Sequence, residues 1–168
     1  MRVGIDVTGI DSVAESFDLF GDRYLSRVFT AQEIEDCGYG PLRVERLAAR
    51  FAAKEAIFKA LRPSNFGADW RMIEVRADTN GACRVVLHDE MCDLAVEQGV
   101  EEIAVSMSYE RSFAAAWAVA SFRTAPTPRS TLLRAMRQLF DRRASAGSSD
   151  RPNRQIRLNT SLMNLSRI

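Results

Sequence analysis

The spacing of apolar and polar side chains predicts a strand followed by helices in the first part of the chain. Residues 2–10 (RVGIDVTGI) alternate loosely between the two kinds of side chain and are rich in β-branched residues, which is typical of a strand. Apolar side chains then recur at helical spacing, which predicts helices over 11–21, 30–38 and 41–61. Thr30 and Glu33 have the spacing of a capping box at the start of the second helix.

The rest of the pattern predicts two β-hairpins around a short helix over residues 89–99. The first hairpin is marked by Asn80-Gly81, a dipeptide that favours two-residue hairpin turns. The expected strand pairs are 70–78 with 83–88 and 102–110 with 113–122. This order of elements predicts an α+β fold, with a mainly antiparallel sheet packed against the long helix at 41–61.

The charge of the chain changes sign near residue 123. Residues 1–123 hold 14 Lys and Arg against 20 Asp and Glu, whereas residues 124–168 hold 9 Arg against 2 Asp. Such a change marks a boundary, so we predict a folded domain at 1–123 and a basic linker and tail, partly helical or disordered, at 124–168. The tail is either a solubilising extension or a segment that steers an acidic partner by salt-dependent attraction.

Composition narrows the classes of function. Apolar residues make up 46% and charged residues 27%, the balance of a soluble globular protein. The apolar runs are too short for a membrane span, although the basic stretch 129–144 leaves association with a membrane surface open. Phe140 is the one aromatic residue of the tail, and we predict no nucleic-acid partner. The three cysteines form no CxxC pair, which predicts a cytoplasmic location.

Candidate chemistry lies in the long helix, where charges interrupt the apolar run ARFAAKEAIFKAL at 49–61. Glu55 and Lys59 lie one turn apart, and as an exposed pair they would contribute only about 0.3–0.5 kcal/mol. The surrounding alanines let a ligand approach, and a carboxylate beside ammonium groups suits a divalent metal and a phosphate. Asp6 is the candidate second carboxylate. In an apolar strand it is costly unless it binds backbone NH groups, forms an ion pair or coordinates a metal.

Six segments resemble the acyl carrier protein synthase family of small 4′-phosphopantetheinyl transferases. They cover residues 3 to about 122 and read, in order, GIDVTGID, YLSRVFTAQEIEDC, ERLAARFAAKEAIFKAL, WRMIEV, TNGACRVVLH and AVSMSYERSFAAAWAV. The resemblance implies the 4′-phosphopantetheinyl transferase fold. It also implies an Mg²⁺-dependent enzyme that moves the 4′-phosphopantetheine arm of coenzyme A to a serine of an acidic apo acyl carrier protein, releasing 3′,5′-ADP.

The same resemblance assigns catalytic and metal-binding roles. Asp6 and Glu55 match the residues that bind Mg²⁺, and Lys59 matches the lysine that contacts the coenzyme A pyrophosphate. We expect Glu55 also to act as the base, directly or through a water on the metal. The resemblance further implies a homotrimer with active sites between subunits. The apolar strand FAAAWAV would form either the trimer core or an ordinary intrachain core.

Further positions match the coenzyme A site of the family. Arg50, Lys54 and Lys59 match basic positions around coenzyme A, while Gly81 and Ser108 match positions in two motifs near the nucleotide. These five residues are the expected cofactor-binding set.

The chain departs from the family pattern at four places. They are Ser12 in place of a carrier-docking arginine, a short loop at 62–69 with only one glycine, Gly81-Ala82-Cys83 in place of Gly-x-Pro, and Tyr109 in place of the histidine of Ser-x-Ser-His. His88, the one histidine, is predicted to be a surface residue at a strand end. The departures affect recognition of coenzyme A and the carrier, while the metal pair is retained, so an active enzyme is favoured. The alternative is a catalytically silent homologue that acts as a carrier-binding or oligomeric scaffold.

Overall fold

The computed structural model describes residues 1–63, 69–78 and 82–123, and the strands within them form two antiparallel sheets. The larger sheet has the order β1-β5-β4, and the smaller one pairs β2 with β3. The strands are β1 (Arg2–Gly9), β2 (Ile73–Ala77), β3 (Cys83–Leu87), β4 (Val100–Glu110) and β5 (Phe113–Phe122). The helices are α1 (Ile10–Phe20), α2 (Asp22–Val28), α3 (Ala31–Cys37), α4 (Arg43–Leu61) and α5 (Asp89–Glu97), with the 3₁₀ turn η1 (Trp70–Met72). The predicted α+β class is confirmed.

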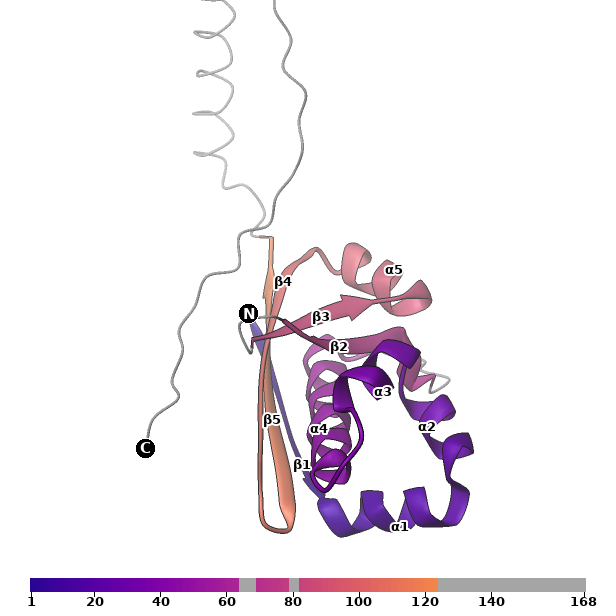
Figure 1. Cartoon of the computed structure of the whole chain (residues 1–168). Helices are drawn as coiled ribbons and strands as arrows, with labels where there is room; N and C mark the ends of the chain where they lie inside the picture. The colour runs from indigo at the N-terminus through magenta and orange to yellow at the C-terminus, as the bar shows by residue number, and fades with distance from the viewer. Residues whose placement is uncertain (64–68, 79–81, 124–168) are drawn as a thin grey trace, which may run out of the picture. The chain divides into compact units, whose positions relative to one another are not determined.

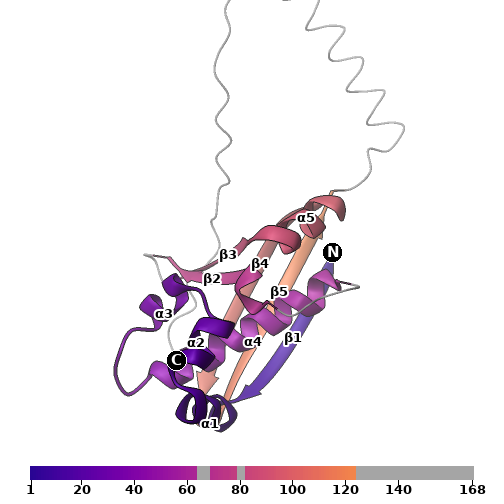
Figure 2. The ribbon, with the colours of Figure 1, turned by 90° about the vertical axis from the view of Figure 1, so that its right-hand side faces the viewer.

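Helix α4 packs along one face of the larger sheet, as Figures 1 and 2 show. Its packing face consists of small residues, and β5 presents alanines at alternate positions toward it. The tightest approach is at Gly4 of β1, where an added Cβ atom would lie 1.8 Å from the carbonyl oxygen of Ala56. Only glycine fits there. This contact sets β1 directly against the part of α4 that carries Glu55 and Lys59.

Helices α1, α2 and α3 lead from β1 back to α4. The predicted capping box begins α3: the Thr30 hydroxyl accepts from the Glu33 amide at 3.2 Å, and the Glu33 carboxylate accepts from the Thr30 amide at 2.9 Å. Helix α2 was not predicted, because only two of its seven residues, Leu25 and Val28, are buried, and so short a helix shows no clear periodicity. Helix α4 begins at Arg43, two residues later than the proline expected to open it.

The two hairpins form where the sequence predicts them. In the first, Val75 faces Val85, and the amide of Asp78 donates to the carbonyl oxygen of Ala82 at 2.7 Å. The predicted turn residues Asn80-Gly81 lie outside the described residues. In the second, Ser106 faces Trp117.

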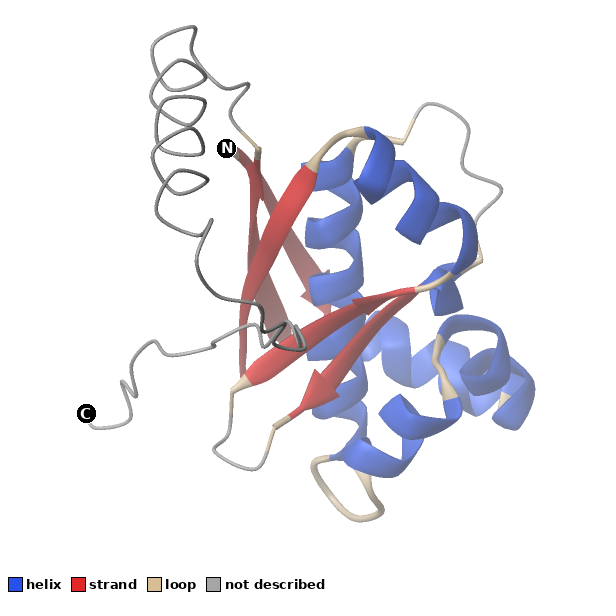
Figure 3. Cartoon of the chain, turned by 90° about the horizontal axis from the view of Figure 1, so that it is seen from above, coloured by secondary structure: helices blue, strands red, loops and turns tan. Residues whose placement is uncertain are grey.

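The outer face of the larger sheet, opposite α4, carries exposed apolar side chains. Val3, Ile5 and Val7 of β1 are each at least half exposed, and Trp117, which lies beside Ile5 on β5, is 47% exposed. Figure 3 shows the helices of the described residues on the other side of this sheet.

Residues Met1–Thr124 form one compact unit of the chain. The predicted basic tail at 124–168 lies outside the described residues, and its role stays a prediction. Among the helices that are described, none is long and apolar enough to cross a membrane.

Candidate active site

Asp6 and Lys59 form an ion pair that joins β1 to α4. The Lys59 Nζ atom lies 2.7 Å from Asp6 Oδ1 and also donates to the carbonyl oxygen of Ile5 at 3.1 Å. The hydroxyl of Thr8, two residues along the same face of β1, donates to Asp6 Oδ2 at 2.8 Å. The Asp6 side chain is 15% exposed and that of Lys59 is 47% exposed. Asp6 is thus held by two donors, whereas the end of Lys59 remains open to a ligand.

Glu55 faces this pair from one turn earlier on α4. Burial raises the pKa of Glu55, the negative charge of Asp6 raises it further, and the positive charge of Lys59 opposes both effects. The structure therefore brings together the three residues assigned to metal binding and catalysis: two carboxylates and one ammonium group at the junction of a strand and a helix.

This donor set fits a hard divalent cation such as Mg²⁺. After burial, the charge of Asp6 is the second cause that raises the pKa of Glu55, and a cation between the two carboxylates would offset this repulsion. Within residues 1–63, 69–78 and 82–123 no cluster of three or more His, Cys, Asp or Glu side chains is gathered for a metal. Two carboxylates completed by water and phosphate oxygens are the usual protein environment of Mg²⁺.

Lys54 does not belong to the ligand-facing set, which corrects its assignment to coenzyme A. Its side chain is fully buried, and its Nζ atom lies 2.7 Å from Glu33 Oε2. The same ammonium donates to the carbonyl oxygens of Trp70 at 2.9 Å and Ile73 at 2.6 Å. Burial lowers the pKa of Lys54, and Glu33 opposes the shift. With three partners, the ammonium has no donor left for a phosphate.

Arg50 and Ser108 meet at a pocket of about 430 Å³ between α4 and β4. Arg46, Ala49, Met107 and Tyr109 complete its lining. Arg50 is only 4% exposed, and its guanidinium bonds to the carbonyl oxygen of Val75 at 3.3 Å and to Cys37 Sγ at 3.2 Å and lies 3.6 Å from the Asp36 carboxylate. Arg50 therefore lines this pocket, but its guanidinium is already bonded to other residues of the protein.

Two residues at these sites were not predicted from the sequence. Thr8 shares a strand face with Asp6, and a hydroxyl at i+2 is the signal that would have identified it. Arg46 lies one helical turn before Arg50, and this spacing would have placed it on the same side of α4. Both are polar residues whose positions follow from the period of their element.

The departures from the family pattern fall at different places. Ser12 is exposed on α1, and Tyr109 is exposed at the pocket of Arg50 and Ser108. His88 directly precedes α5, and its Nε2 atom lies 2.7 Å from the Glu74 carboxylate, so it is a partner of a buried acid and not only a surface residue. Gly81 and most of the 62–69 loop lie outside the described residues, so the role expected for Gly81 stays a prediction.

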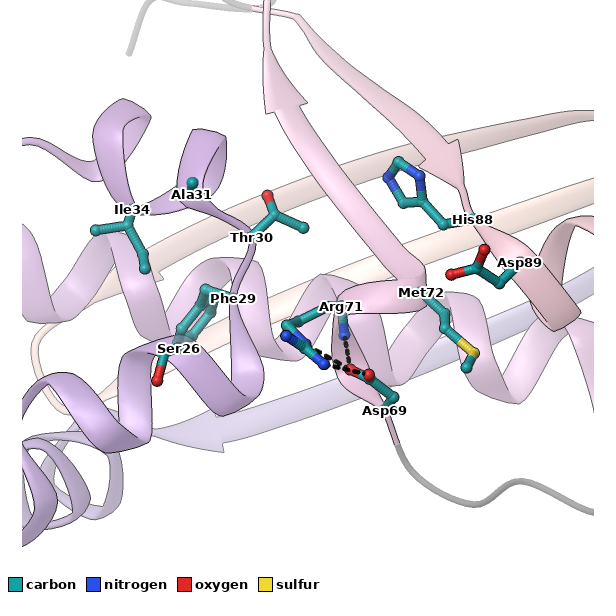
Figure 4. Close-up of a pocket in the computed structure, with 10 residues that line it drawn as sticks. All are labelled: Ser26, Phe29, Thr30, Ala31, Ile34, Asp69, Arg71, Met72, His88 and Asp89. Carbon is teal, nitrogen blue, oxygen red and sulfur yellow. Dashed lines mark hydrogen bonds and ion pairs between the residues drawn. The ribbon is translucent and has the colours of Figure 1, made fainter.

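A larger hollow, of about 560 Å³, is lined by residues of α2, α3 and η1 and by the start of α5 (Figure 4). Its polar side includes Asp69 and Arg71, which form a bidentate pair with N–O distances of 2.9 and 2.6 Å. The bonds from Arg71 lower the pKa of Asp69 to about 2. None of the residues assigned from the sequence lines this hollow.

Residues 2–119 match the model of the 4′-phosphopantetheinyl transferase superfamily. The chain belongs to this superfamily. Among similar transferases, the holo-[acyl-carrier-protein] synthase of Moorella thermoacetica is 40% identical over 119 residues, which are 71% of this chain and 92% of the relative. That of Halothermothrix orenii is 35% identical over 117 residues, or 70% of this chain and 94% of the relative.

Solved transferase structures show the same fold. The holo-[acyl-carrier-protein] synthase of Neisseria meningitidis superimposes with a TM-score of 0.65 at 29% identity, covering 71% of this chain and 97% of that one. A complex of the Chronobacterium ammoniagenes enzyme with coenzyme A gives 0.65 at 29% identity, covering 73% and 98%. The predicted family, fold and enzyme class are confirmed.

Proposed function

We propose that this transferase moves the 4′-phosphopantetheine arm of coenzyme A to a serine of an apo acyl carrier protein and releases 3′,5′-ADP. The convergence of Asp6, Glu55 and Lys59 carries the proposal. Phosphoryl transfer depends mainly on positioning and on neutralising charge, and this site offers two metal-binding carboxylates beside a cation. Relatives named for this reaction and a structure with coenzyme A support the same assignment.

In this reaction the serine oxygen forms a bond to the β-phosphorus of coenzyme A, and the bond from that phosphorus to the bridging oxygen of ADP breaks. Asp6 and Glu55 would hold Mg²⁺, which neutralises charge on the pyrophosphate when bound. Glu55 accepts the serine proton, directly or through a water molecule. Lys59 exchanges its contact with Asp6 for the pyrophosphate and offsets charge on the departing ADP, because its half-exposed end can turn toward the ligand.

The pocket of Arg50 and Ser108 is the proposed second contact with coenzyme A. Two arginines and two hydroxyl-bearing side chains line it, which suits an anionic group. Arg46 adds a cation that the sequence assignment did not include. Tyr109 offers a hydroxyl where the family has a histidine, so this pocket would donate a hydrogen bond without adding a positive charge.

A homotrimer is proposed from the uncovered face of the larger sheet. Ile5 and Trp117 face each other across β1 and β5, and both are about half exposed. Burying these side chains against neighbouring subunits would remove a large apolar surface from water. The Trp117→Asp variant should therefore dissociate, as measured by analytical ultracentrifugation. An unchanged mass in that variant contradicts the proposed interface.

The proposed partner is an acidic carrier. Helix α1 lacks the docking arginine at Ser12 and exposes Asp11 and Glu15, so it would repel such a partner. Arg23 and Arg27 are exposed on α2, the next helix. We therefore place carrier docking at α2. The cytoplasmic location stays a prediction.

Incubation with coenzyme A, Mg²⁺ and apo carriers, followed by intact-mass analysis, tests the reaction directly. The carrier should gain the mass of phosphopantetheine, and the Glu55→Gln variant should transfer none. No gain on any carrier, together with carrier binding, would instead establish the silent scaffold. Unaltered transfer by Glu55→Gln would sink the assignment of Glu55.

A further inference from the structure

A buried ion pair lies directly behind the proposed active site. Lys54 precedes Glu55 on α4, and both Lys54 and its partner Glu33 are fully buried. Glu33 also accepts from the amides of Thr30 at 2.9 Å and Val75 at 2.9 Å. The pair therefore ties α3 and β2 to α4. A buried pair is costly to desolvate and is often no more stabilising than apolar residues of the same size, so stability alone does not explain it.

Lys54 also holds the turn η1 at both ends. Its ammonium donates to the carbonyl oxygen of Trp70, the first residue of η1, and to that of Ile73, the residue that ends it. The position of Trp70 along α4 is therefore set by a group that lies one residue from Glu55.

The Trp70 ring packs against Phe51 and Phe58, the phenylalanines about one turn before and one turn after Glu55 on α4. Its centroid lies 5.5 Å from that of Phe51 and 5.7 Å from that of Phe58. Phe51, Glu55 and Phe58 are four and three residues apart, so they follow one another along one side of the helix. Along the helix axis, Glu55 thus lies between the two phenylalanines whose rings contact the Trp70 indole.

We propose that Lys54, together with Glu33, is a positioning residue for Glu55: it clamps η1 and so fixes the aromatic cluster of Phe51, Trp70 and Phe58 that flanks Glu55. Catalytic groups need neighbours whose rotamers are locked by packing, and a carboxylate beside a loosened cluster would sample other orientations. The inference rests on the proposed transfer reaction, in which Glu55 binds metal and accepts a proton.

The Lys54→Met/Glu33→Gln double variant tests the clamp without leaving a buried charge unpaired. The amide that replaces the Glu33 carboxylate keeps one acceptor oxygen, which can serve the amide of Thr30 or that of Val75 but not both, so the fold of the double variant is checked by its melting transition. The bonds from Lys54 to Trp70 and Ile73 are lost. We expect kcat to fall by about 100-fold, the cost of roughly 1 Å of misplacement in an active site. The KM for coenzyme A should change little, because Arg50, Ser108 and Lys59 remain.

Fluorotryptophan labelling supplies a readout that does not depend on activity. The chain has two tryptophans, so fluorine NMR gives two signals, and Trp70→Phe assigns them. The Trp70 signal should shift or broaden in the double variant while the Trp117 signal stays. The matched control is Arg71→Met, which removes an exposed ion pair from the same turn and should leave kcat and the Trp70 signal unchanged.

Three results would overturn the proposal. The first is a wild-type kcat in a double variant whose Trp70 signal has moved, and the second is a Trp70 signal that does not move. The third is a kcat that returns to the wild-type value once the double variant is assayed at a temperature at which it is fully folded. If the double variant does not fold, Trp70→Ala tests the same link with the buried pair intact, and wild-type kcat there also overturns it. Absence of transfer by the unaltered chain in the same assay would instead contradict the proposed function.

Discussion

Replacing Gly4 with alanine should separate the two elements that form the active site. The new Cβ atom would lie 1.8 Å from the carbonyl oxygen of Ala56 and 2.8 Å from the amide nitrogen of Ala60. Both obstacles are backbone atoms of a buried helix, so neither can turn aside. An ordinary contact begins at 3.4 Å, so restoring one requires the Cβ atom and the Ala56 oxygen to move apart by about 1.6 Å.

That displacement has two separate consequences. Overpacking of this kind costs about 1–3 kcal/mol of unfolding free energy. It also carries Asp6 away from Glu55 and Lys59, and misplacement by about 1 Å in an active site can lower the rate about 100-fold. The rate should therefore fall in protein that is still folded, because the stability loss alone leaves most molecules native.

Two assays on the same sample measure these effects separately. Intact-mass analysis of transfer to an apo carrier gives the rate, and urea denaturation gives the free energy of unfolding. The matched control is Gly9→Ala on the same strand, where the nearest atom to the new Cβ is the Ser12 hydroxyl oxygen at 3.4 Å, an ordinary contact. Gly9→Ala should retain both rate and stability. A destabilised Gly4→Ala protein that transfers at the wild-type rate would show that the spacing of Asp6 from α4 does not limit the reaction.

Two further predictions concern charge. The folded-state pKa of Glu55 is raised, so ionisation of Glu55 lowers the stability of the fold as pH rises through that pKa. Without Mg²⁺ at pH 7, the Glu55→Gln variant should therefore melt at a higher temperature than the unaltered chain. The difference in melting temperature should vanish in acid, where Glu55 is protonated. Equal melting temperatures at pH 7 would contradict the burial of Glu55. Lys54→Met alone leaves Glu33 buried without its cation and should cost about 3–5 kcal/mol in urea denaturation, whereas adding Glu33→Gln should recover most of the loss. No recovery would mean that packing, and not charge, dominates at this position.

The fold was predictable wherever an element was long enough to show its period. Helix α4 and both hairpins follow from apolar spacing and turn residues, and α3 follows from its capping box. Helix α2 did not, because seven residues with two buried positions carry too little pattern. The close approach at Gly4 was also hidden, since a glycine in a strand does not show which backbone it meets.

Of the candidate site, the sequence predicted the charges that face the junction of β1 and α4 but not those buried behind it. Lys54 and Lys59 are the same residue type on one helix, five positions apart, and both match basic positions of the family. A separation of five residues turns the side chain by about 140°, enough to move it to another side of the helix. Lys59 lies on the side of α4 that faces β1, where it pairs with Asp6 and stays about half exposed to solvent. Lys54 lies on the side that faces α3 and η1, where Glu33 and two backbone carbonyl oxygens enclose it. The side of α4 that becomes buried depends on Glu33 and Trp70. Both residues lie outside α4, so the apolar pattern of the helix alone does not identify that side. The family resemblance therefore identified both lysines as functional, and only their surroundings separate the ligand-facing one from the one that we propose positions its neighbour.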